Sequence, residues 1–187
     1  MDKHQAVHPA ARYFSQWSGA SPAVRAGCLF LLLALLVALP FPASAGEWSL
    51  LLNGKALHLE NPAGTNYNES NWGAGVQYDF DALDGNWVPL ATVSGFNDSN
   101  KNPSYYAGGG ILKRFDFGPE KYQLHADVGL VAFVMVREGF RGHQPFLGAL
   151  PMAALGAGRV TVNLTFIPRT EPKGVPILFF QLKIGLG

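Results

Sequence analysis

A short polar loop in the middle of the chain places a carboxylate beside a hydroxyl. It runs Phe96-Asn97-Asp98-Ser99-Asn100-Lys101-Asn102-Pro103, between two strand-like segments. An Asp-Ser pair in a turn usually serves the turn itself, because both side chains can hydrogen-bond to nearby backbone groups. The same pair can also supply a hydroxyl nucleophile or oxyanion donor beside a charge that supports a base. Both interpretations of Asp98 and Ser99 remain open on the loop alone.

The first 45 residues have the pattern of a secretory signal peptide. An apolar run over residues 28–39 follows Arg25 and ends at Pro40, and Ala43-Ser44-Ala45 is a small-x-small cleavage site. The run is shorter than the roughly 20 residues that a transmembrane helix needs. We therefore expect a signal peptide over residues 1–45 and one exported domain over residues 46–187, with only Gly46-Glu47 before the first strand.

The composition narrows the class of protein. Of 187 residues, 48% are hydrophobic and 14% charged, whereas charged residues make up about 25% of soluble domains. The only cysteine, Cys28, lies in the expected signal peptide, so the exported domain has no disulfides in an oxidising compartment. A formal net charge of +1 without a basic cluster argues against a nucleic-acid partner. The histidines after residue 45 lack ligand spacing, so we expect no metal and no cofactor.

Strand-like segments separated by Gly, Asn, Asp and Pro fill the chain after Gly46. We assign eight of them, at roughly 48–59, 72–80, 87–97, 104–115, 122–136, 146–154, 160–167 and 175–184. Alternating segments of about 9 to 14 residues after a signal peptide are typical of an outer-membrane barrel. A secreted β-sandwich shows the same alternation of apolar and polar residues. The choice between a barrel and a sandwich therefore depends on the character of the two faces of each segment.

One face of each segment is apolar, and in four of the segments the other face changes character along its length. In 122–136 the second face begins with Gln123, His125 and Asp127 and continues with Gly129, Val131, Phe133 and Met135. Segments 72–80, 160–167 and 175–184 change in the same sense. These faces predict an all-β fold, an eight-stranded antiparallel transmembrane β-barrel with an apolar pocket in its outer half. Such a barrel is wide enough to be filled or to hold one small ligand, so a packed apolar core is the alternative.

The order and spacing of several short motifs resemble a known family. The motifs are Tyr67-Asn68-Glu69, Trp72-Gly73-Ala74-Gly75, Gly85-Asn86-Trp87, Phe96-Asn97-Asp98-Ser99, Ala107-Gly108-Gly109-Gly110, Leu150-Pro151-Met152-Ala153, Gly156-Ala157-Gly158 and Thr165-Phe166-Ile167-Pro168. Over about residues 48–184 the chain resembles the lipid A palmitoyltransferases, the PagP-like outer-membrane acyltransferases. The resemblance implies a monomeric, membrane-embedded enzyme of the Gram-negative outer membrane. It would transfer a palmitoyl chain from a phospholipid donor to a lipid A acceptor.

The resemblance also implies the site residues. The family's catalytic histidine, aspartate and serine match His58, Asp98 and Ser99, with His58 as a base near neutral pH. The last glycine of the Ala107–Gly110 motif matches the floor of the family's acyl pocket. The residues expected to line that pocket are Gly108, Gly110, Val131, Phe133 and Met135. Pro151 and Pro168 match family prolines that would leave a gap in the wall for lateral access of a lipid chain, because proline removes a ladder donor.

Two other functions fit the same features. A lipid A deacylase or phospholipase would use water as the acceptor and release a free fatty acid. A small adhesion or stress barrel would have no activity and would tolerate substitution of His58.

Overall fold

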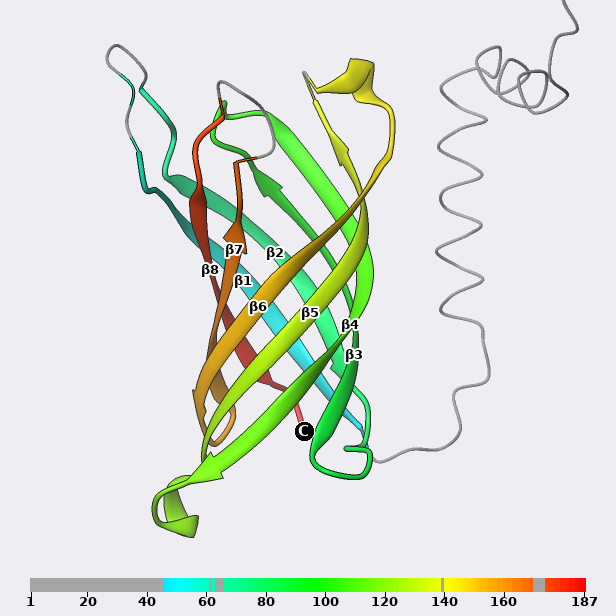
Figure 1. The fold of residues 1–187 in the computed structure, drawn as a ribbon, viewed down its shortest axis with the longest axis vertical. Helices are drawn as coiled ribbons and strands as arrows, with labels where there is room; N and C mark the ends of the chain where they lie inside the picture. The colour runs from blue at the N-terminus through cyan, green and yellow to red at the C-terminus, as the bar shows by residue number, and fades with distance from the viewer. Residues whose placement is uncertain (1–45, 61, 63–65, 139, 170–173) are drawn as a thin grey trace, which may run out of the picture. The chain divides into compact units, whose positions relative to one another are not determined.

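The computed structural model describes residues 46–60, 62, 66–138, 140–169 and 174–187. The expected signal peptide lies outside these residues. From Glu47 on, eight antiparallel strands pair in chain order and close into a barrel (Figure 1), as predicted. The strands are β1 (Glu47–His58), β2 (Ser70–Asp79), β3 (Trp87–Asn97), β4 (Pro103–Phe117), β5 (Leu124–Arg137), β6 (Phe146–Ala157), β7 (Val160–Ile167) and β8 (Ile177–Gly185). Two short 3₁₀ turns, η1 (Glu120–Tyr122) and η2 (Arg141–His143), lie between strands. Within the described part of the chain, no helix is long and apolar enough to cross a membrane.

The strand ends lie within three residues of the prediction, and the differences in β5 and β6 have a visible structural cause. Tyr122 belongs to η1, and Gln123 has a left-handed backbone with φ 46°, so β5 begins at Leu124. Gln123, expected on the inward face, is therefore an exposed residue of the preceding turn. Strand β6 continues past residue 154 because its ladder with β5 extends to the pair Leu124 and Ala157.

The outward faces carry the large apolar side chains. Trp72 is 71% exposed and Leu147 83% exposed, and Leu130 and Leu155 are also exposed. A barrel that presents such a surface can bury it only in lipid or in a partner, since water disfavours extended apolar area. Val131 and Phe179, whose inward orientation the predicted register requires, are each only 7% exposed. Because a shift of one residue would invert every face, their burial confirms the predicted register.

Paired charges fill the inner half of the lumen. Lys183 Nζ lies 2.6 Å from Asp79 Oδ2. Arg114 donates two hydrogen bonds of 2.9 Å to the carboxylate of Asp127. Buried ions are tolerated when they are paired and hydrogen-bonded in this way. The predicted polar inner half of the lumen is thus present.

An apolar cluster lies on the inward faces of the four adjacent strands β3 to β6, above these charges. It consists of Leu90, Leu112, Val131 and Met152, and all four side chains are buried. On β4 the inward positions on the outer side of Leu112 are Gly110 and Gly108, while Arg114 lies on the inner side. On these strands the cluster therefore lies between the charged inner half and the other positions predicted to line an acyl pocket, since Val131 belongs to both sets.

A second polar group reaches the middle of the lumen, and its side-chain contacts were not predicted. Asn53 donates to Ser94 Oγ at 2.7 Å, and Gln181 donates to the side-chain oxygens of Asn53 and Tyr106. Phe179, the next inward residue of β8, packs against Phe96 with ring centroids 5.1 Å apart. The inward faces therefore change from polar to apolar at different depths of the lumen on different strands.

Candidate functional site

His58 and Ser99 meet at the outer end of the barrel. His58 ends β1, and Ser99 lies in the loop after β3. Figure 1 shows that β1 and β3 end at the same end of the barrel. Ser99 Oγ lies 3.0 Å from His58 Nε2, and the His58 side chain is only 3% exposed. A buried imidazole in hydrogen-bond contact with a hydroxyl is the geometry a base needs to remove a proton from that hydroxyl. The two residues are separated by 41 positions in the chain, and the barrel topology brings them together as predicted.

A β-bulge in β1 turns His58 inward. Ser49, Leu51 and Asn53 are buried at odd positions, whereas the buried residue after the irregularity is Ala56, at an even position. The ladders to β2 and β8 both shift register after Asn53. A bulge inserts one extra residue and reverses which side chains face inward. Without it, strict alternation would point His58 toward lipid.

Asp98 stabilises its own loop and an ion pair. Its Oδ1 accepts the backbone N–H groups of Asn100 at 2.8 Å and of Asn102 at 3.0 Å. Its Oδ2 accepts Arg137 Nε at 2.6 Å. These contacts fix an irregular turn, in which Asp98 N also donates to Asn102 O, and this turn frees Ser99 to face His58. The interactions of Asp98 are thus those of turn chemistry plus a salt bridge with Arg137.

The segment Tyr67-Asn68-Glu69, before β2, contacts every part of this site. The Tyr67 ring stacks on the His58 ring with centroids 4.1 Å apart. Asn68 donates its backbone N–H to Ser99 O and its side-chain amide to Asp98 O. Glu69 Oε1 lies 3.8 Å from His58 Nδ1. The sequence showed this segment only as a short motif, and we predicted no role for it or for Arg137.

The predicted acyl-pocket residues share one face of β4 and β5. The register pairs Gly108 with Phe133 and Gly110 with Val131, next to the buried apolar cluster. Gly110 has a structural reason to be glycine, because a Cβ there would meet Leu130 O at 2.5 Å and Val131 Cγ2 at 2.9 Å. A side chain at Gly110 would therefore disturb the β4–β5 ladder as well as occupy the lumen. Met135 lies further out on the same face, paired with Phe146.

The two prolines predicted for lateral access lie beside a short ladder. Strands β6 and β7 pair only from Ala157 and Val160 to Met152 and Thr165. Pro151 is the next residue of β6 and faces outward, exposed. Pro168 follows the last residue of β7 instead of lying within the strand.

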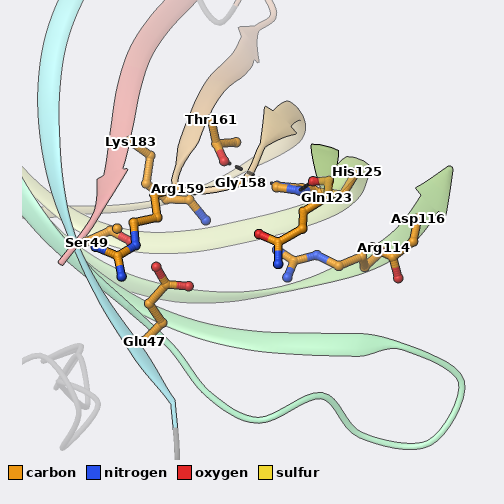
Figure 2. Close-up of a pocket in the computed structure, with 11 residues that line it drawn as sticks. Glu47, Ser49, Arg114, Asp116, Gln123, His125, Gly158, Arg159, Thr161 and Lys183 are labelled. Carbon is orange, nitrogen blue, oxygen red and sulfur yellow. Dashed lines mark hydrogen bonds between the residues drawn. The ribbon is translucent and has the colours of Figure 1, made fainter. Parts of the chain in front are cut away.

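A polar cavity of about 290 Å³ lies at the opposite, inner end of the barrel. Figure 2 shows its charged lining, which includes Glu47, Arg114, Asp116, Arg159 and Lys183. An acyl chain would bury apolar carbons against charges there, which is unfavourable. Because this cavity lies at the other end of the barrel and is lined by charges, it is distinct from the site at His58.

Fold and site together define a class, a lipid-facing β-barrel with a serine–histidine pair at its rim. Residues 53–183 match the family model described as antimicrobial peptide resistance and lipid A acylation protein PagP. The chain belongs to the PagP family, as predicted.

Named relatives agree with the family match. "Lipid A acyltransferase PagP" of Methylobacillus flagellatus is 32% identical over 119 residues, covering 64% of this chain and 62% of that protein. The protein of the same name from Legionella pneumophila strain Paris is 30% identical over 133 residues, covering 69% and 67%. The matches thus span about three fifths to two thirds of the length of these relatives. Together the barrel and the family indicate an outer-membrane protein.

A solved structure is also similar. The attachment invasion locus protein Ail of Yersinia pestis aligns with a TM-score of 0.44 and 11% identity, covering 75% of this chain and 95% of that one. This similarity is too low to support a functional assignment.

Proposed function

We propose that this protein is a lipid A acyltransferase that moves a palmitoyl chain from a glycerophospholipid to lipid A. The observation that carries the proposal is the 3.0 Å contact between buried His58 and Ser99 at the rim of a barrel of the PagP family. The printed names of the relatives, lipid A acyltransferases, support the reaction class. Residues 1–45 would be a signal peptide that exports the chain, and the barrel would act as a monomer without a cofactor.

The chemistry requires a base and a hydroxyl beside an ester. His58 would take the proton of the attacking hydroxyl, whether that of Ser99 or that of the lipid A acceptor. The new ester bond to the acyl carbon forms as the donor ester bond breaks, and His58 passes the proton to the departing lysophospholipid oxygen. If Ser99 is the nucleophile, the lipid A hydroxyl then attacks the acyl-serine ester in the same way, and its proton returns through His58 to the Ser99 oxygen. Lipid A gains one acyl chain, and the donor loses one.

The donor chain would lie in the outer half of the lumen, with its end on the apolar cluster. Gly108, Gly110, Phe133 and Met135 would line it, and Val131 belongs to the floor. Burial of each methylene contributes about 0.8 kcal/mol, so an apolar lumen favours a long chain. Entry would be lateral, beside Pro151 and Pro168, where the β6–β7 ladder has ended.

The test is the mass of lipid A in living cells. Gram-negative cells without an enzyme of this kind would express either the wild-type chain or the Ser99→Ala variant. We expect wild-type cells to contain lipid A heavier by one palmitoyl chain, and cells with the variant to lack it. Equal lipid A masses in cells with and without the wild-type chain would reject the proposal.

A further inference from the structure

His58 Nδ1 lacks a hydrogen-bond partner among the described residues, although the atom is buried. For His58 to act as a base toward Ser99, Nε2 must accept the proton. The neutral ring then carries its own proton on Nδ1, which needs an acceptor to hold that tautomer. A buried donor without an acceptor is costly, so the group that faces Nδ1 decides whether the ring is ready to react.

We propose that Glu69 is the positioning residue for His58, accepting the Nδ1 proton and stabilising the imidazolium that forms during acyl transfer. The inference rests on the proposed function, whose histidine it concerns. Glu69 Oε1 lies 3.8 Å from Nδ1, within the range of an ion pair and one small side-chain rotation from a hydrogen bond. Asp98 is committed elsewhere, because its oxygens accept from Asn100, Asn102 and Arg137.

The surroundings of Glu69 fix its carboxylate in this place. Glu69 O accepts the backbone N–H of Ala56 at 2.9 Å, which ties the residue to β1 two positions before His58. Lys55 Nζ lies 3.1 Å from Glu69 Oε2, and its hydrogen bond lowers the pKa of Glu69. The oxygen that faces His58 is Oε1, so one carboxylate serves both neighbours and stays ionised.

The neighbours of Glu69 complete the support of the site. Tyr67 covers one face of the His58 ring in a parallel stack, with planes 5° apart. Asn68 holds the Ser99 loop through two hydrogen bonds. Among the described residues, the ionisable groups around the ring are thus Glu69 and Tyr67 in contact, Lys55 behind Glu69, and the Asp98–Arg137 pair behind Ser99. The consecutive residues Tyr67, Asn68 and Glu69 therefore set the distance and orientation between the His58 ring and the Ser99 hydroxyl.

The test compares Glu69→Gln with Glu69→Asp in purified, refolded enzyme acting on phospholipid donor and lipid A. Replacing a carboxylate that orients a metal-binding histidine costs about 10- to 100-fold in metal affinity or activity, and we use this as the scale for a carboxylate that orients a base. We expect Glu69→Gln to lower kcat by at least tenfold with KM nearly unchanged. The acidic limb of its pH–rate profile should move to lower pH, because the imidazole loses a negative charge that favours protonation. Glu69→Asp should recover part of kcat and return the limb toward its wild-type position.

Two further variants separate positioning from mere stability. Lys55→Gln breaks the same ion pair but keeps the carboxylate, so its kcat should fall less than threefold. Glu60→Gln removes an exposed carboxylate from the same rim loop and should behave as wild type. An equal loss in Lys55→Gln and Glu69→Gln, or an unmoved acidic limb in Glu69→Gln, would overturn the role of Glu69. Absence of transfer by the wild-type enzyme would instead reject the proposed function.

Discussion

At the scale of residues, the site depends on how two short segments are held in place. Ser99 faces His58 because Asp98 closes the turn that carries it, and Asp98 in turn is held by Arg137. The contacts of the two residues differ accordingly. The contacts of Asp98 are structural, and those of Ser99 are suited to chemistry.

Removing either member of the pair should abolish transfer while leaving the barrel folded. In His58→Ala the hydroxyl loses its base, and in Ser99→Ala the base loses its hydroxyl, so we expect at least a 100-fold loss of activity in each. Mass spectrometry of the lipid products measures transfer, and heat-dependent gel mobility checks the fold. Near-normal activity in folded His58→Ala would exclude His58 as the base.

Arg137→Gln should weaken the site indirectly. The substitution leaves the buried Asp98 carboxylate with its two backbone donors but without its cation. We expect this to lower the free energy of unfolding by about 1–3 kcal/mol. We expect a lower melting temperature and roughly tenfold lower transfer, since the Ser99 loop is less well fixed. Lys113→Gln, at the opposite end of the barrel, is the control and should change neither. Wild-type activity in Arg137→Gln would show that the ion pair does not hold the loop.

At the scale of elements, the proposed acyl pocket would end at the apolar cluster, which would then limit how deep an acyl chain can reach. Met152→Ala removes part of that floor, so the variant should prefer longer donors, by about fourfold for each methylene newly buried. It should also lose stability, typically about 2–5 kcal/mol for such a truncation. Competition between donors of different acyl-chain length, followed by mass spectrometry of the products, measures this preference. The control is Leu155→Ala, because Leu155 lies on the outward face of the same strand.

An unchanged donor length in folded Met152→Ala would place the acyl chain elsewhere. This variant tests the floor better than a substitution of Gly110. A side chain at Gly110 would meet the backbone of β5. A change in activity could then come either from a shallower pocket or from a distorted β4–β5 ladder, and the two causes could not be told apart.

At the scale of the whole molecule, alternation predicted the barrel because the pattern is repeated in every strand. Val131 and Phe179 faced inward as expected, and so did the charged inner residues Asp79, Asp127 and Lys183. A repeated pattern averages over local errors, which is why strand ends moved by a few residues without changing the topology.

The details of the site could not be predicted in the same way. The orientation of His58 depends on one bulge after Asn53, and a single extra residue leaves no clear mark in a periodic pattern. The partner of Asp98 is Arg137, 39 positions away, and only the closed register brings them together. Glu69 was visible only as part of a short motif, and its position against His58 follows from how the loop before β2 folds back.

The most direct test of the account follows the acyl chain itself. Purified wild-type barrel would receive a glycerophospholipid with an isotopically labelled palmitoyl chain, together with unlabelled lipid A, and all products would be identified by mass spectrometry. If the protein is a lipid A acyltransferase, we expect the label in lipid A, with lysophospholipid formed in equal amount and neither product formed by Ser99→Ala. Label recovered as free palmitate, with lipid A unchanged, would contradict it and identify a hydrolase.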